Sequence, residues 1–227
     1  MYYRNITHGI FRARPNRFVA EVETVNGIEL VHVKNTGRCR ELLVPGYTVY
    51  LEASENPNRK TRYDLVAVKR DNLLINMDAQ APNQVFIEWA MDGHFLDGLT
   101  LLRSEYRWGQ SRFDFYWEAG TRKGLVEVKG CTLEKAGLAL FPDAPTERGV
   151  KHLHELTRAV SEGFECTLCI VIQMKGVHTF RPNDDTHRAF GEALRQASKK
   201  GVKIMAMDCL VTPDSLQIDE PVAICLN

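Results

Sequence analysis

Three side chains near the middle of the sequence have types and spacing suited to chemistry on phosphate esters: Asp114, Glu127 and Lys129. Residues 112–117 and 125–130 alternate in the way expected of β-strands, and a turn-like stretch separates them. Because residues i and i+2 of a strand share a face, Glu127 and Lys129 project together, while the valines beside them face the other way. The second strand is therefore predicted to separate a charged face from an apolar one.

A hairpin built from these two strands would bring two carboxylates together. If the pairing is symmetric about Gly120 and Thr121, Asp114 lies directly opposite Glu127. Like charges at such positions repel each other, and a hard divalent cation with oxygen ligands, Mg²⁺ or Mn²⁺, would offset the repulsion. Lys129 would then orient a water or stabilise negative charge developing on phosphorus. The same spacing also fits a sheet face on which Lys129 only forms an ion pair with one of the acids.

A predicted helix over residues 147–162 carries three basic side chains near its start, Arg148, Lys151 and His152. Free backbone N–H groups and the helix dipole favour an anion at this end, so the three side chains would hold a DNA phosphate beside the carboxylates. Two alternatives stay open. The basic turn could only keep the helix soluble, or His152 or His154 could act as the general base of a small-molecule enzyme.

The first 80 residues contain short strand-like segments separated by turn signals such as Asn26-Gly27 and Pro45-Gly46. The five expected strands cover residues 18–25, 28–33, 47–51, 65–68 and 73–75. Five short strands without a helix indicate a small β-barrel such as an OB-fold. The expected loops are basic, and we predict a phosphate-binding rim whose main members are Arg12, Arg14, Arg38 and Arg40. An ordinary solvated surface would have a similar composition.

The periodicity changes at about residue 80, where Pro82 interrupts the chain and Asn83 is predicted to cap a helix. Strands and helices then alternate to the end of the chain, which describes an α/β domain with a mixed sheet. The sequence thus predicts an OB-fold-like domain over residues 1–80 and an α/β domain over residues 81–227. An exposed edge of the barrel would allow two chains to pair as a homodimer.

Composition agrees with a globular protein, because 44% of the 227 residues are hydrophobic and 26% are charged. The 29 basic and 29 acidic side chains balance, which argues against tight non-specific binding to phosphates. No run approaches the ~18 apolar residues of a membrane span, and residues 1–5 do not resemble a signal peptide, so a cytoplasmic protein is expected. Cys166 and Cys169 have the spacing of zinc ligands but lie in an apolar strand, so we expect buried thiols.

Residues 141–153, which read FPDAPTERGVKHL, and the upstream segment Asn35-Thr36-Gly37-Arg38 resemble the sugar fermentation stimulation protein A family of prokaryotes. The resemblance extends over essentially the whole chain. It implies an N-terminal OB-fold, a C-terminal domain of the PD-(D/E)xK nuclease type, DNA binding, and a link to the regulation of sugar utilisation genes.

Carried over to this sequence, the nuclease motif falls on Asp114, Glu127 and Lys129, with Glu88 as an additional acid from the preceding helix. Arg112 and Phe113 precede Asp114 where the motif has proline. Because nuclease folds can persist as binding modules, the resemblance leaves two functions open. One is a DNA-binding protein with a Mg²⁺- or Mn²⁺-dependent phosphodiesterase site, and the other is a non-catalytic DNA-binding regulator.

Overall fold

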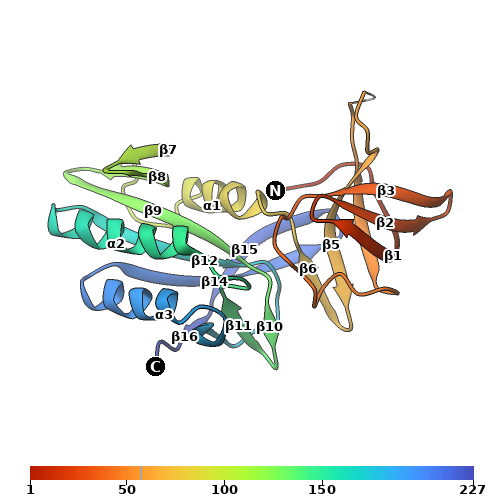
Figure 1. Ribbon diagram of the computed structural model, residues 1–227. Helices are drawn as coiled ribbons and strands as arrows, with labels where there is room; N and C mark the ends of the chain where they lie inside the picture. Colours follow the sequence, from red (N-terminus) through yellow and green to blue (C-terminus); the bar gives the residue numbers. More distant parts are fainter. Residues whose placement is uncertain (57) are drawn as a thin grey trace.

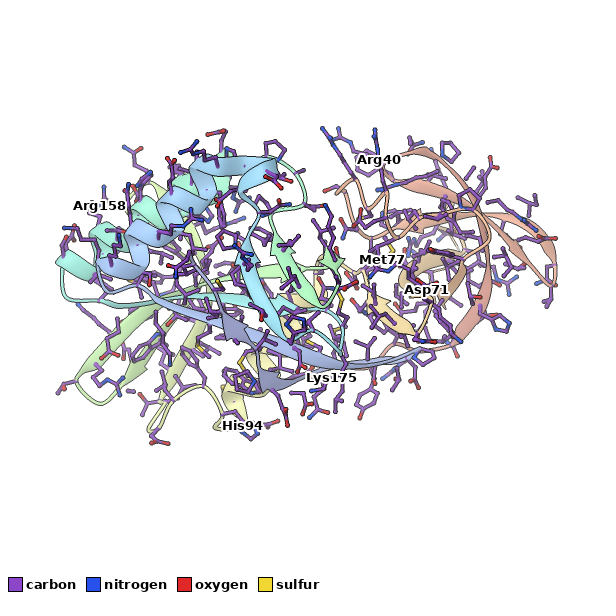
Figure 2. All side chains as sticks on the ribbon, turned by 90° about the horizontal axis from the view of Figure 1, so that it is seen from below. Arg40, Asp71, Met77, His94, Arg158 and Lys175 are labelled. Carbon is purple, nitrogen blue, oxygen red and sulfur yellow. The ribbon has the colours of Figure 1, made fainter. Side chains whose placement is uncertain are left out.

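The computed structural model describes residues 1–56 and 58–227 and contains a β-barrel followed by an α/β domain (Figure 1). Figure 2 shows Met77 between the two domains and Arg40 on the edge of the barrel. Within the described residues, no helix is long and apolar enough to span a membrane.

The barrel domain contains six strands, in the order β3-β2-β1-β4-β5-β6, and a short pairing of β3 with β5 closes the barrel. The strands are β1 (Ile6–Asn16), β2 (Val19–Thr24), β3 (Gly27–Val33), β4 (Thr48–Ala53), β5 (Tyr63–Arg70) and β6 (Leu73–Asn76). The predicted OB-fold is confirmed, but β1 was expected to be a basic loop. Two register shifts along its pairing with β2 interrupt the two-residue alternation, so the sequence pattern of a strand is lost there.

The α/β domain is built on a mixed sheet in the order β15-β14-β12-β9-β8-β7, in which β9, β12 and β14 run parallel. Its strands are β7 (Leu101–Trp108), β8 (Ser111–Ala119), β9 (Arg122–Cys131), β12 (Glu165–Ile172), β14 (Lys203–Thr212) and β15 (Ser215–Pro221). A second, smaller sheet contains β10 (Glu134–Lys135), β11 (Leu138–Phe141), β13 (Thr179–Pro182) and β16 (Ala223–Ile224).

Helices cover both faces of the main sheet. Helix α1 (Ala81–Met91) packs on one face, whereas α2 (Glu147–Ser161) and α3 (Asp184–Lys199) pack together on the other (Figure 1). The two faces have separate apolar clusters, one with Phe86 and Phe115 and the other with Leu125 and Leu153. The helix predicted after residue 80 is present, but its N-cap is Gln80 and not Asn83, which lies inside the first turn.

The β8–β9 hairpin has the predicted register. Phe115 pairs with Val126 and Ala119 with Arg122, so the turn is centred on Gly120 and Thr121. Counted outward from the turn, the ladder extends to Phe115 and stops one residue short of Asp114. Cys166 and Cys169 are free and buried in β12, where burial raises the pKa of each thiol to about 12.

A buried polar cluster joins the two domains. This junction cluster contains Tyr3, Asn76, Asp78 and Gln173. The amide of Gln173, just after β12, donates to Asn76 Oδ1 at 2.8 Å and to the carbonyl of Asp78 at 3.0 Å, and Asn76 Nδ2 donates to the Tyr3 hydroxyl at 2.8 Å. Lys34 Nζ lies 2.7 Å from Asp78 Oδ2. Residues 1–3 bond to β15 or to the turn before it, so the start of the chain packs against the α/β domain.

Candidate metal centre

Glu127 and Lys129 lie on β9, a central strand flanked by β8 and β12. The position of the strand explains why the Glu127 side chain is only 1% exposed, while the longer Lys129 side chain is 20% exposed. The ammonium of Lys129 donates to Glu127 Oε1. The expected sharing of one face is therefore realised, and the lysine and the carboxylate form a direct ion pair.

Asp114 is held in place by two donors from different elements. Asn83 Nδ2, in the first turn of α1, donates to Asp114 Oδ1 at 2.9 Å, and the backbone N–H of Val128 donates to Oδ2 at 2.8 Å. Burial, and next the negative charge of Glu127, raise the pKa of Asp114. The two carboxylates thus interact electrostatically, as the hairpin predicted. Asn83 was missed as a site residue because the sequence pattern predicted it as the cap of the helix, whereas its amide bonds Asp114.

His152 is the second partner of Glu127. Its side chain is buried, and its Nδ1 hydrogen-bonds Glu127 Oε1. Burial acts to raise the pKa of Glu127, but the hydrogen bond from His152 and the charge of Lys129 outweigh it and lower the pKa. Both partners contact the same carboxylate oxygen. The other, Oε2, is buried and has no hydrogen-bond partner among the described residues.

The three basic residues at the start of α2 do not share one environment. Arg148 and Lys151 are exposed, and Lys151 Nζ donates to the carbonyl of Gln110 at 3.2 Å. His152 is 4% exposed, so the expectation that it binds nucleic acid directly does not fit its position. The buried stripe of α2 consists of Gly149, His152, Leu153, Leu156 and Ala159. The three- and four-residue spacing of this stripe is the signal that would have placed His152 inside.

The structure does not bring Glu88 to this pair of acids. Its Oε2 lies 2.5 Å from the amine of Met1, and its Oε1 accepts from Gln84 at 2.8 Å. A helix turns by about 100° per residue, so Glu88 projects roughly 140° around α1 from Asn83. It faces β15 and lines a cavity with Trp89 and Ser215.

The predicted rim arginines of the barrel divide into two groups. Arg12 pairs with Glu23, and the Arg14 guanidinium donates to the carbonyls of Arg17, Asn35, Gly37 and Arg38 at 2.7–2.9 Å. Arg38 and Arg40 are exposed. Arg14 therefore organises the Asn35–Arg38 loop, and the exposed pair remains available to solvent.

An OB barrel followed by an α/β domain with a mixed sheet defines the class of this protein. The chain belongs to the sugar fermentation stimulation protein family: residues 80–215 match the sugar fermentation stimulation protein RE domain, and residues 13–77 match the SfsA N-terminal OB domain.

Relatives and a solved structure match over the full length. The sugar fermentation stimulation protein homolog of Desulfitobacterium hafniense strain Y51 is 57% identical over 226 residues, covering 100% of this chain and 99% of the relative. The homolog of Ruminiclostridium cellulolyticum is 50% identical and is covered in full. Pyrococcus furiosus SfsA, solved in complex with Ca²⁺, superposes with a TM-score of 0.89 at 26% identity, over 99% of this chain and 97% of that one.

Proposed function

We propose that this protein binds DNA and hydrolyses phosphodiester bonds at a divalent-metal site formed by Asp114 and Glu127. The observation that carries the proposal is the buried Glu127 Oε2, which has no partner among the described residues and lies in a site with a second carboxylate and Lys129. Buried polar atoms are normally hydrogen-bonded, so an unpaired carboxylate oxygen is a ready acceptor for a cation.

The donor set fits Mg²⁺ or Mn²⁺. Within the described parts of the chain, no three His, Cys, Asp or Glu side chains form a metal-binding group. Mg²⁺ needs only one or two carboxylates from the protein because it retains water and binds substrate phosphates. A relative in complex with Ca²⁺, another cation that prefers oxygen ligands, supports the same class of metal. When bound, the ion supplies Lewis-acid stabilisation of the phosphate and lowers the pKa of a coordinated water.

The remaining side chains position the reacting groups. Asn83 and the N–H of Val128 hold Asp114, and the ammonium of Lys129 stabilises negative charge that develops on the phosphate oxygens. Arg148 and Lys151 are exposed at the start of α2, where they hold the phosphate of the substrate. These roles use charge and orientation, which are the main requirements of phosphoryl transfer.

Binding of DNA is assigned to two accessible basic surfaces, Arg38 and Arg40 on the barrel and Arg148 and Lys151 on α2. Figure 2 shows Arg40 projecting from the barrel edge. Because the net charge is zero, the affinity for DNA is expected to be moderate and to fall steeply with salt.

The second candidate is a non-catalytic DNA-binding regulator of sugar utilisation genes. The observation that favours it is the ion pair of Lys129 with Glu127, which already neutralises the carboxylate without a metal. In that case the acids serve the fold and the same basic surfaces bind DNA.

Cleavage of single-stranded and supercoiled DNA in Mg²⁺, Mn²⁺ or EDTA separates the two candidates. The wild type is compared with Glu127→Ala and Lys129→Ala, and DNA binding is followed in parallel by fluorescence anisotropy. We expect metal-dependent nicking that both substitutions abolish while binding persists. Absence of nicking in every metal, with salt-sensitive binding intact in all three proteins, would favour the regulator.

A further inference from the structure

His152 is a buried histidine whose two ring nitrogens both have protein partners. Its Nδ1 bonds Glu127 Oε1, and its Nε2 lies 3.4 Å from Nε of Arg148, one turn earlier on α2. The ring also packs against Phe113, with the centroids 5.7 Å apart. The imidazole thus stands between an exposed arginine and the buried carboxylate.

These partners determine the tautomer. A guanidinium can only donate hydrogen bonds, so Nε2 of His152 must accept from Arg148. The ring proton of the neutral imidazole then resides on Nδ1 and is donated to the carboxylate of Glu127. Since neither nitrogen is left to face a substrate, a role as general base or as a nucleic-acid contact does not fit this geometry.

The consequence for Glu127 is a fixed orientation. His152 and Lys129 both donate to Oε1, and this divides the carboxylate into one saturated oxygen and one unpaired oxygen, Oε2. Lys129 is a flexible side chain, whereas the His152 ring is held by a helix and by Phe113. The ring is therefore the rigid member of the pair that sets the direction of the free oxygen.

We propose that His152 is a positioning residue that directs Glu127 Oε2 toward the divalent cation and links it to the phosphate-holding Arg148. This inference rests on the proposed function, because it concerns the ligand geometry of the same metal centre. Outer partners that orient a metal ligand typically contribute about 10–100-fold to metal affinity.

Binding of Mn²⁺ to the full-length protein, followed by electron paramagnetic resonance of the free ion, tests the proposal without DNA or turnover. Substitution His152→Leu removes both polar contacts and keeps an apolar filler on the buried stripe of α2. We expect its Mn²⁺ affinity to fall about 10–100-fold. His154→Leu is the matched control, since His154 is exposed on the same helix, and it should bind like the wild type.

Two further variants separate orientation from folding. His152→Asn keeps a donor close to the place of Nδ1, whereas His152→Gln carries its donor one methylene further out. We expect Asn to recover most of the Mn²⁺ affinity and Gln to recover little. If the Leu variant does not fold, the comparison of the Asn and Gln variants still tests the positioning role. Equal Mn²⁺ affinities of these two variants would overturn the proposal.

The outcomes distinguish this inference from the function on which it rests. A wild-type protein that binds no Mn²⁺ would overturn both. Normal Mn²⁺ binding by folded His152→Leu would overturn only the positioning role. Nitrogen NMR of the imidazole in the metal-free protein gives an independent check, because a proton on Nε2 instead of Nδ1 would contradict the assigned tautomer.

Discussion

The junction cluster and the Glu127 site are both buried, but they differ in how completely their polar groups are paired. In the junction cluster, Tyr3, Asn76, Asp78 and Gln173 are hydrogen-bonded to one another. At the candidate metal centre, Glu127 is equally buried, yet its Oε2 has no partner among the described residues. A satisfied network rigidifies a structure, whereas an unsatisfied acceptor costs free energy unless a ligand supplies the missing contact. The contrast separates a cluster that fixes two domains from one that we propose binds a divalent cation.

The substitution Glu127→Gln would test the contrast most directly. It keeps the shape of the side chain but removes the charge that attracts the cation, so we expect the Mn²⁺ affinity to fall by at least about 100-fold, more than an outer partner contributes. Titration calorimetry measures the change, and Glu162→Gln, at the exposed C-cap residue of α2, is the control. Unchanged Mn²⁺ binding by Glu127→Gln would show that the unpaired oxygen is not the metal ligand.

The substitution Asn76→Ala should lower the stability of the protein and leave its Mn²⁺ affinity unchanged. It leaves the Tyr3 hydroxyl, the Gln173 amide and the backbone N–H of Asp78 without the same partner in a buried site. We expect the free energy of unfolding to fall by about 2–4 kcal/mol while the Mn²⁺ affinity is retained. Urea denaturation and calorimetry report the two quantities. A large loss of Mn²⁺ affinity in a folded Asn76→Ala protein would mean that the clusters are coupled and not separate.

Two arginines of the barrel also differ in how completely they are paired: Arg14 bonds backbone carbonyls, whereas Arg38 is exposed. In Arg14→Lys, one ammonium replaces a guanidinium that serves four carbonyls, so the free energy of unfolding should fall by about 1–2 kcal/mol. In Arg38→Ala, stability should be unchanged, and the slope of DNA affinity against salt should decrease by about one. Urea denaturation and anisotropy at several salt concentrations check both. The interpretation fails if the two variants behave alike.

The smallest expected effect concerns pH. Burial, and next the charge of Asp78, raise the pKa of Tyr3 above its ordinary value. Above about pH 10 the unfolded chain releases this phenolic proton while the folded protein retains it, so stability is lost as the pH rises. The substitution Tyr3→Phe should make that loss shallower by at most about 1.4 kcal/mol per pH unit. Urea unfolding at alkaline pH measures the slope, and identical slopes in both proteins would contradict the assignment.

Local patterns were sufficient for much of the fold. The strands from β2 to β6, the helix α2 and the register of the β8–β9 hairpin follow from alternation, helical spacing and turn residues. These patterns act between near neighbours in the chain. Strand β1 was missed because its bulges break the alternation. The cap of α1 was misplaced because Asn83 bonds Asp114 from another element and not its own helix.

The sequence by itself determined that Glu127 and Lys129 share a face of one strand, because the side-chain period of a strand is a property of its own backbone. Only the tertiary structure decided what surrounds them. The position of α2 buries His152 against Glu127, 25 residues away, and the packing of α1 brings Asn83 to Asp114, 31 residues away. Contacts of this kind depend on which helix excludes water from which face of the sheet, and no local period contains that information.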